Sequence, residues 1–208
     1  INFAPVADVW DNPANTVVKY RSFGTDPRLV SDMSTALLNG LRKNQILGAM
    51  KHFPGHGSTE ADTHAGYAYT NKTMSELEVC ELIPFQAGIA NDVEFIMVGH
   101  ISLPNVTGDN TPASLSSAII TGILREKLQY QGLVITDALN MGAITQDYSS
   151  RDAAVMALKA GVDVLLMPKD FTAAYQGVLE AVRNGEISEA RIDSSVRRIL
   201  KVKVEKLR

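Results

Sequence analysis

The stretch ILGAMKHFPGHG, residues 46–57, joins an apolar run to a loop of unusual composition. The run 46–52 predicts a buried strand, and the proline and glycines that follow it predict a turn. Three of the four histidines in the chain fall within thirteen residues here, and an aspartate lies among them: His52, His56, Asp62 and His64. Histidine titrates near neutral pH, and a core gains nothing from such a loop. The segment therefore predicts a functional site.

Similar apolar runs recur along the chain and alternate with helical patterns. The predicted strands are residues 1–9, 46–52, 94–100, 132–137 and 163–168. The predicted helices are 27–43, with Leu29, Met33, Leu37 and Leu41 on one side, then 73–90 with a kink at Pro84, 116–128, 150–160, 171–183 and 188–207. Strands that are apolar throughout and alternate with helices indicate a parallel sheet covered on both faces.

The carboxyl ends of four consecutive predicted strands carry Asp, Lys or His, where Gly, Ser or Asn is more usual. These residues are Asp8, Lys51 with His52, His100 and Asp137. Active sites of (β/α)8 barrels are built at this end of the strands. The fold class predicted is therefore α/β, a (β/α)8 TIM barrel with about five βα units in this chain. Residues 1–208 would form the C-terminal portion of one catalytic barrel domain. The missing barrel strands would come from upstream sequence or from another chain.

Composition excludes several other classes. The 208 residues are 45% hydrophobic, enough for a core, and the net charge of −3 comes without a long basic block, so we expect no nucleic-acid partner. No apolar run has the roughly 18 residues of a membrane span. One cysteine, Cys80, permits no internal disulfide. No glycine-rich dinucleotide motif follows the first strand, and we expect no cofactor.

Five segments of the chain together resemble glycoside hydrolase family 3. They are NFAPVAD (2–8), RSFG (21–24), KHFPGHG (51–57), DTH (62–64) and TDALNM (136–141). Within the family, they are most similar to bacterial β-N-acetylglucosaminidases of the NagZ type, and the last segment resembles the Gram-positive form. The family's earlier Asp-x-Glu-Gly-Gly-Arg segment has no counterpart here.

The resemblance implies a TIM barrel and a retaining mechanism without metal or cofactor. It assigns Asp137 as nucleophile, His64 as general acid/base and Asp62 as the partner of His64. Arg21, Lys51 and His52 match sugar-binding positions. The implied substrates carry a terminal N-acetylglucosamine and are peptidoglycan-derived muropeptides or chitooligosaccharides. The implied location is secreted or at the cell envelope of a bacterium, although the sequence itself does not fix the compartment.

These residue types suit glycoside cleavage. A retaining reaction needs an attacking carboxylate opposite an acid/base, and a histidine serves as acid/base when its pKa lies near the working pH. Asp62, two residues before His64, would fix its tautomer. Gly55, Gly57 and Gly66 would act as hinges for a mobile loop. We expect Asp8 to orient Arg21 or Lys51, His56 to support the loop, and His100 either to support the site or to end its strand.

Two other functions fit parts of the pattern. A metal-dependent TIM-barrel hydrolase would use His52, His56, Asp62 and His64 as zinc ligands, although no helix or strand presents two of the histidines together. An inactive sugar-binding fragment is the second alternative, because the barrel strands are incomplete. Retained turnover in the presence of a chelator would argue against the first, and turnover lost in Asp137→Asn would argue against the second.

Overall fold

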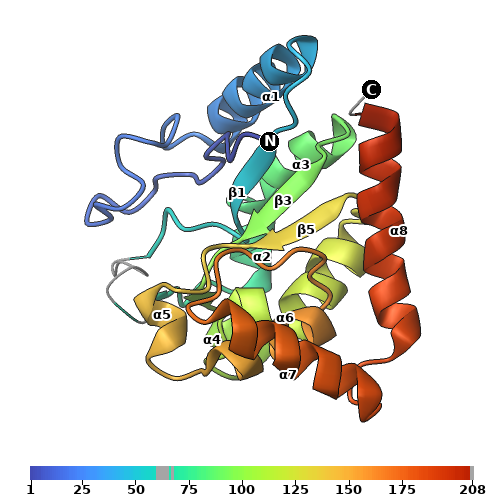
Figure 1. Ribbon diagram of the computed structural model, residues 1–208. Helices are drawn as coiled ribbons and strands as arrows, with labels where there is room; N and C mark the ends of the chain where they lie inside the picture. Colours follow the sequence, from blue (N-terminus) through green and yellow to red (C-terminus); the bar gives the residue numbers. More distant parts are fainter. Residues whose placement is uncertain (60–65, 67, 207–208) are drawn as a thin grey trace.

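A parallel sheet forms the centre of the molecule. The computed structural model describes residues 1–59, 66 and 68–206. Strands β1 (Ala49–Phe53), β3 (Phe95–Val98) and β5 (Leu133–Thr136) pair in parallel in the order β1-β3-β5 (Figure 1). The order of the strands in space follows their order in the chain, as in consecutive units of a barrel. This confirms the predicted α/β class and barrel topology.

The first and last predicted strands are present as extended segments joined to the sheet by isolated bridges. In the first segment, Asn2 pairs in parallel with Gly48, just before β1, and Val6 pairs with Lys51 of β1. In the last segment, Val164 pairs in parallel with Ile135 of β5. The strands predicted over residues 1–9 and 163–168 are therefore longer than the pairing observed in these segments. Pro5 has no N–H to donate to a ladder, which shortens regular pairing in the first segment. Five parallel segments remain, as the sequence indicated.

Both faces of the sheet are buried, which explains why its strands are apolar throughout. Along β3, Ile96 and Val98 point to one face and Phe95 and Met97 to the other. The first face packs on the helices that connect the strands. The second face packs on Ile199 and Val202 of the last helix, α8 (Glu189–Lys206). Alternating side chains thus enter two separate apolar clusters.

Three helices match their predicted bounds because their ends are marked by local capping residues. They are α1 (Pro27–Lys43), α6 (Ser150–Ala160) and α7 (Phe171–Arg183). The side chains of Asp26, Ser149 and Asp170 each accept a backbone N–H in the first turn. Such bonds satisfy donors that have no partner inside the helix.

Helix α1 buries a different face from the predicted one. Its buried residues are Val30, Ser31, Ser34 and Leu38. The predicted stripe is not buried, since the side chains of Leu29, Met33 and Leu37 are 47%, 45% and 38% exposed. Leu38 enters the larger core cluster, whereas the exposed stripe faces away from it. The helix therefore presents apolar residues on two sides.

The predicted helix 73–90 is two helices, α2 (Met74–Glu78) and α3 (Leu82–Ala90). Glu76 accepts the Thr73 backbone N–H at 2.7 Å, so the sequence Thr73-Met74-Ser75-Glu76 forms a capping box at the start of α2. The kink predicted at Pro84 was wrong. The break lies between Glu78 and Leu82, and Pro84 falls in the first turn of α3, where its missing N–H costs no hydrogen bond.

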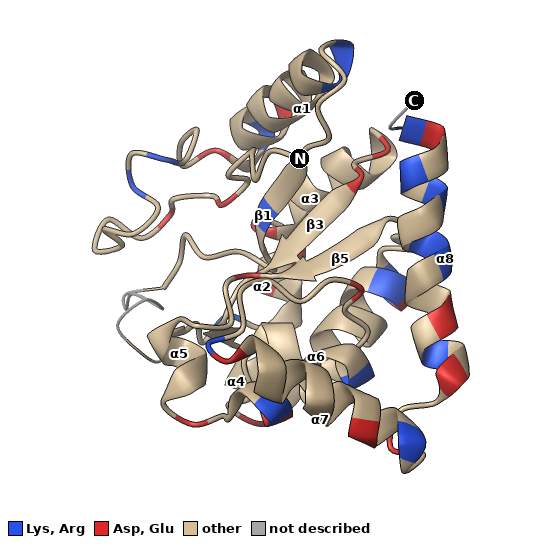
Figure 2. Cartoon of the chain, in the orientation of Figure 1, with Lys and Arg blue, Asp and Glu red and all other residues tan. Residues whose placement is uncertain are grey.

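The segment predicted as helix 116–128 forms η2, a π-helix over Ala118–Lys127. Its buried residues include Ile120, Ile123 and Leu124. The last helix, α8, is fixed by Asp163, whose buried carboxylate accepts hydrogen bonds from Ser195 and Arg198 at 2.6 and 3.2 Å. Arg191 also points inward and donates to the carbonyls of Leu158 and Val162. The exposed cations of α8 include Arg197, Lys201 and Lys203, and Figure 2 shows blue Lys and Arg positions along this helix. None of the described helices has the length and apolar character required to cross a membrane.

Five short elements were not predicted. They are β2 (Ala68–Tyr69), β4 (Ile101–Ser102), α4 (Pro104–Thr107), the 3-10 helix η1 (Ala113–Leu115) and α5 (Gly142–Thr145). All five belong to segments that follow the carboxyl ends of β1, β3 and β5. Strands β2 and β4 pair in parallel as a separate small sheet. These elements build the rim on which the candidate site lies.

Candidate active site

Asp8 is the buried centre of the site. Its side chain is fully buried, and its Oδ1 accepts the backbone N–H groups of His52 at 3.1 Å and His56 at 2.7 Å. Its Oδ2 lies 2.7 Å from Nδ1 of His52. Burial acts to raise the pKa of Asp8, but His52 and His56 outweigh burial, and the pKa is lowered. Asp8 is therefore an ionised acceptor that links the first strand-like segment to β1 and its loop.

The Asp8 carboxylate determines the orientation of His52. Because an ionised carboxylate can only accept, Nδ1 of His52 carries the proton that faces Asp8. The opposite nitrogen, Nε2, then lies 4.0 Å from Oδ2 of Asp137. The three residues form a line from the buried interior to the rim. The expectation that Asp8 orients Arg21 or Lys51 was wrong, since its partners are the two histidines.

Asp137 follows β5 and stands at the opening of the site. Its backbone N–H donates to Val98 O at 2.9 Å, which ties the turn to β3. Its Oδ1 accepts the N–H of Ala138 at 2.8 Å, and its side chain is 18% exposed. The carboxylate is thus fixed through one oxygen, while Oδ2 faces His52 and the opening.

Lys51 and Arg21 supply positive charge around this carboxylate. Burial lowers the pKa of Lys51, Asp137 acts in the opposite direction, and Arg21 lowers it further. These mutual effects place Lys51 within electrostatic reach of both residues. Arg21 is exposed, and its Nε donates to Val17 O at 3.0 Å. The structure therefore brings Arg21, Lys51, His52 and Asp137 to the same rim.

His56 and the loop around it are held rigidly. Nδ1 of His56 lies 2.7 Å from the hydroxyl of Thr59, and burial lowers the pKa of His56. The buried amide of Asn15 donates to the carbonyls of His56 and Thr59 at 2.7 and 2.8 Å. A Cβ on Gly57 would lie 1.7 Å from Val9 O, so only glycine permits this close approach. His56 has the supporting position that its loop context predicted.

His100 lies beneath the turn that carries Asp137. Its Nδ1 is 2.7 Å from the Ser114 hydroxyl, and its Nε2 is 3.0 Å from Ala138 O. Since a carbonyl only accepts, Nε2 donates and Nδ1 accepts from Ser114. Burial lowers the pKa of His100, which favours this neutral form. Of the two predicted roles, the structure places His100 as a support for the site.

Two predicted residues, Asp62 and His64, lie outside the residues that the structure describes, as does most of the predicted mobile loop. The loop's carboxyl end is described at Gly66. A Cβ on Gly66 would lie 3.2 Å from Oε1 of Gln146, so this end of the loop passes close to α5. Asp62 and His64 as acid/base pair remain predictions.

Among the described residues, one group of metal-ligand types converges, Asp11, Cys80 and Glu81. The ammonium of Lys72 binds both carboxylates of this group, and a cation would have to displace it. The zinc alternative proposed His52 and His56 together with Asp62 and His64, and the group of metal-ligand types found among the described residues contains neither His52 nor His56. The described geometry therefore does not favour a metal centre built on these histidines.

Sequence reasoning missed several residues that hold the site in place. Asn15, Thr59 and Ser114 are buried polar side chains that bind the histidines or their backbone. Each lies in a segment without a recognisable motif, and nothing in the local sequence indicates which histidine it would contact. One feature of the sequence indicated such partners. The histidines lie in a Gly-rich loop, and the backbone groups of a buried loop need hydrogen-bond partners from other segments.

The chain resembles known proteins over nearly its whole length. The profile of "Glycosyl hydrolase family 3 N terminal domain" matches residues 1–202. Beta-hexosaminidase A of Pseudoalteromonas piscicida is 34% identical over 99% of this chain and 38% of its own length. Beta-hexosaminidase LpqI of Mycobacterium tuberculosis is 36% identical over 98% of this chain and 54% of its own.

The fold is also similar to that of a solved enzyme. A glycoside hydrolase family 3 beta-N-acetylglucosaminidase from Paenibacillus sp. str. FPU-7 superposes with a TM-score of 0.97 and 39% sequence identity. The match covers 99% of this chain and 40% of that one. The chain therefore spans about 38–54% of the length of these relatives.

Proposed function

The chain belongs to glycosyl hydrolase family 3, and from this premise we propose that it carries the nucleophile side of a retaining β-N-acetylglucosaminidase site. The observation that carries the proposal is the position of Asp137, a rim carboxylate with one oxygen fixed by Ala138 and the other turned towards His52. The substrates would be muropeptides or chitooligosaccharides with a terminal, non-reducing N-acetylglucosamine.

The first half of the reaction would form a bond between Asp137 and the sugar. An Asp137 oxygen attacks the anomeric carbon, the glycosidic C–O bond breaks, and His64 donates a proton to the departing oxygen. Lys51 and Arg21 would donate hydrogen bonds to hydroxyl groups of the sugar. His52, oriented by Asp8, presents Nε2 to a hydroxyl next to Asp137.

The second half would release the sugar. A water molecule gives a proton to His64 and attacks the anomeric carbon, and the bond to Asp137 breaks. Asp62 would stabilise the protonated form of His64 before the first step and after the second. The support for a histidine in this role is its sequence position two residues after Asp62, on the loop that reaches α5 at Gly66.

A trapping experiment tests the nucleophile directly. The complete protein would be incubated with an activated fluorosugar analogue of N-acetylglucosamine, whose fluorine slows release of the intermediate. We expect the intact mass to rise by one sugar and peptide sequencing to place the label on Asp137. A label on any other carboxylate, or turnover that a chelator abolishes, would contradict the proposal. An unlabelled protein that binds N-acetylglucosamine without turnover would support the inactive sugar-binding alternative.

We also propose that the chain is the C-terminal portion of one catalytic barrel domain, completed by further βα units. The support is apolar surface at both ends of the sheet. At one end lies the exposed stripe of α1, and at the other Phe171 and Tyr175 of α7 are 71% and 57% exposed. Met33→Asp in the complete protein should then cost about 2 kcal/mol or more, as for a buried side chain. A change within about 0.5 kcal/mol, as at a free surface, would contradict this arrangement.

A further inference from the structure

Lys72 joins two carboxylates from distant parts of the chain. Its ammonium group forms ion pairs with Asp11, which follows the first strand-like segment, and with Glu81, the N-cap residue of α3. Glu81 is fully buried, and its Oε2 has no hydrogen-bond partner among the described residues. A buried carboxylate is costly without a compensating cation. Lys72 supplies that cation, and we call these three residues the Lys72 tether.

The charges of the Lys72 tether support one another. Burial acts to lower the pKa of Lys72, but its bonds with Asp11 and Glu81 outweigh burial, and the pKa is raised. Burial raises the pKa of Glu81, and Lys72 acts in the opposite direction. Without Lys72, burial and the charge of Asp11 would both favour the neutral form of Glu81. Removing the one cation therefore disables the tether as a unit.

The Lys72 tether connects the segments that carry the candidate site. Glu81 lies against the turn after β1, since a Cβ on Gly55 would clash with Cγ of Glu81. Asp11 comes three residues after Asp8, the buried centre of the site. Lys72 itself follows β2, which comes after the loop from β1. One ammonium group thus holds three separate parts of the rim together.

The two described ends of the loop after β1 are also bound to each other. The Ser58 hydroxyl donates to Oγ1 of Thr70 at 3.2 Å. The side chain of Asn12, next to Asp11 in the chain, donates to Ser58 O at 3.3 Å. In the sequence, the predicted acid/base pair lies between these two ends. The described ends therefore fix where the segment with the predicted acid/base departs and where it returns.

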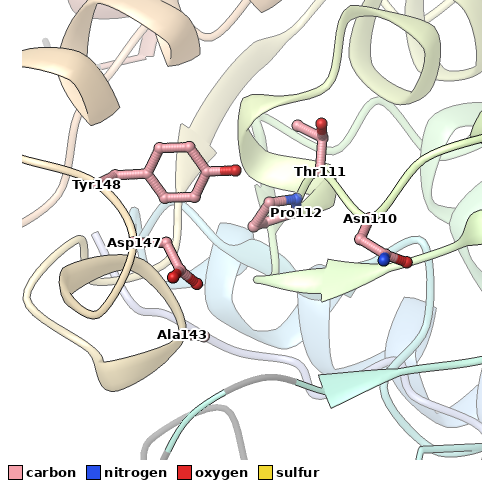
Figure 3. Close-up of a pocket in the computed structure, with 6 residues that line it drawn as sticks. All are labelled: Asn110, Thr111, Pro112, Ala143, Asp147 and Tyr148. Atoms are coloured by element: carbon pink, nitrogen blue, oxygen red, sulfur yellow. The ribbon is translucent and has the colours of Figure 1, made fainter.

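The small sheet holds the returning end from another side. Strand β2 pairs with β4, and the N–H of Thr70 donates to Ser102 O at 3.0 Å. Ser102 also bridges to Pro112, which Figure 3 shows in the lining of a cavity of about 510 Å³. The returning end is thus attached to the rim near Pro112, and Lys72 provides its second attachment, to the segment that follows Asp8.

We propose that Lys72 is a positioning residue for the acid/base step. Through Asp11 and Glu81 it fixes the returning end of the loop relative to Asp8 and the turn after β1, so that the acid/base reaches the departing oxygen. This inference rests on the proposed function. Because Lys72 acts through the loop and not through the sugar, its loss affects protonation of the leaving group more than attack by Asp137.

The test compares two substrates of the complete protein that differ in their need for a proton. Chitobiose releases a sugar through an alcohol oxygen, which departs with a proton from the acid. Dinitrophenyl N-acetylglucosaminide releases a stable phenolate that needs no proton. In Lys72→Met, the ratio of kcat/KM for chitobiose to kcat/KM for the dinitrophenyl substrate should fall about tenfold. A purely structural role would lower both values alike, and an unchanged ratio would overturn the proposal.

The matched control is Lys127→Met. Lys127 also pairs with a glutamate, Glu78, but their side chains are 49% and 36% exposed, and exposed pairs contribute little. The ratio should stay at the wild-type value. If Lys72→Met does not fold, Asp11→Asn provides the test, because it weakens one arm of the tether at a side chain that is 29% exposed. Its ratio should fall in the same direction by less, and an unchanged ratio would equally overturn the proposal.

Hydrogen exchange separates this proposal from the proposed function, because it requires no turnover. Followed by mass spectrometry, the backbone amides of peptides covering 54–59 and 68–72 should exchange faster in Lys72→Met than in wild type, and Lys127→Met should match wild type. If wild type hydrolyses neither substrate, the proposed function fails, while faster exchange still supports Lys72 as the group that holds the loop ends. Unchanged exchange in both peptides would refute the tether.

Discussion

Two aspartates at the carboxyl ends of parallel segments, Asp8 and Asp137, occupy opposite environments. Asp8 is fully buried and accepts three hydrogen bonds, from two backbone N–H groups and from the ring of His52. Asp137 is partly exposed and, within the described residues, accepts one hydrogen bond, from Ala138. Its second oxygen, Oδ2, lies 4.0 Å from Nε2 of the histidine that Asp8 orients.

This difference explains how one rim can be both rigid and reactive. A fully buried carboxylate that accepts hydrogen bonds through both oxygens cannot reach a substrate, but it can fix the groups around it. A carboxylate held by one oxygen keeps its direction and retains a second oxygen for bond formation. The same residue type thus builds the site at position 8 and would perform chemistry at position 137.

The largest expected effect comes from Asp137→Asn. We expect kcat on an aryl N-acetylglucosaminide to fall by about 1,000-fold or more, because an amide is a poor nucleophile. The melting temperature should change by less than about 2 °C, since Asn still accepts from Ala138 at a partly exposed site. Steady-state kinetics and calorimetry measure the two quantities. A large loss of stability would mean that Asp137 is a structural residue like Asp8.

The second largest effect is expected for Asp8→Asn, where the main loss should be in stability. Asn retains an acceptor for the backbone donors but places an NH₂ against Nδ1–H of His52, which removes a buried hydrogen bond to an ionised carboxylate. We expect a loss of about 3–5 kcal/mol in the free energy of unfolding, measured with urea. The control is Asp193→Asn on the exposed side of α8, expected within about 0.5 kcal/mol. Similar stabilities of the two variants would contradict the assignment of Asp8 as the buried centre.

A smaller effect is expected for Ser114→Ala, which removes one bond beneath Asp137. Buried Nδ1 of His100 would lose its donor, at a cost of about 1–3 kcal/mol in unfolding free energy. The kcat should fall less than in Asp137→Asn, because His100 still donates to Ala138 O. Ser114→Cys, which keeps a weak donor, should recover part of both losses. No difference between the alanine and cysteine variants would mean that the hydrogen bond has no role.

The smallest expected effect is a pH dependence of the difference in unfolding free energy between wild type and Asp8→Asn. The folded-state pKa of Asp8 lies below the ordinary 3.8, with burial opposing and the two histidines causing the decrease. Its stabilisation is therefore complete above about pH 4 and is lost as the pH falls through the folded value. Urea unfolding between pH 7 and 3 should show a constant gap that narrows only below about pH 4. A gap that grows in acid would refute this ionisation state.

Local sequence features predicted a large part of the fold. The predicted bounds of α1, α6 and α7 match the structure, in which the caps Asp26, Ser149 and Asp170 lie within a few positions of each helix start. The break before α3 was missed, because Pro84 resembles a kink in sequence yet fits a first helical turn. The buried face of α1 was also missed, since Leu29 and Leu38 are equally apolar and only packing partners distinguish them.

For the candidate site, the sequence by itself determined which residue types stand at the strand ends, because apolar runs and their polar boundaries are written locally. It placed Asp8, Lys51, His52, His100 and Asp137 on one rim. Only the tertiary structure decided how they pair. Asp8 binds groups 44 and 48 positions away, and His100 binds Ser114 and Ala138, which are 14 and 38 positions away. Hydrogen-bond partners at such separations depend on how whole βα units pack, which no local pattern encodes.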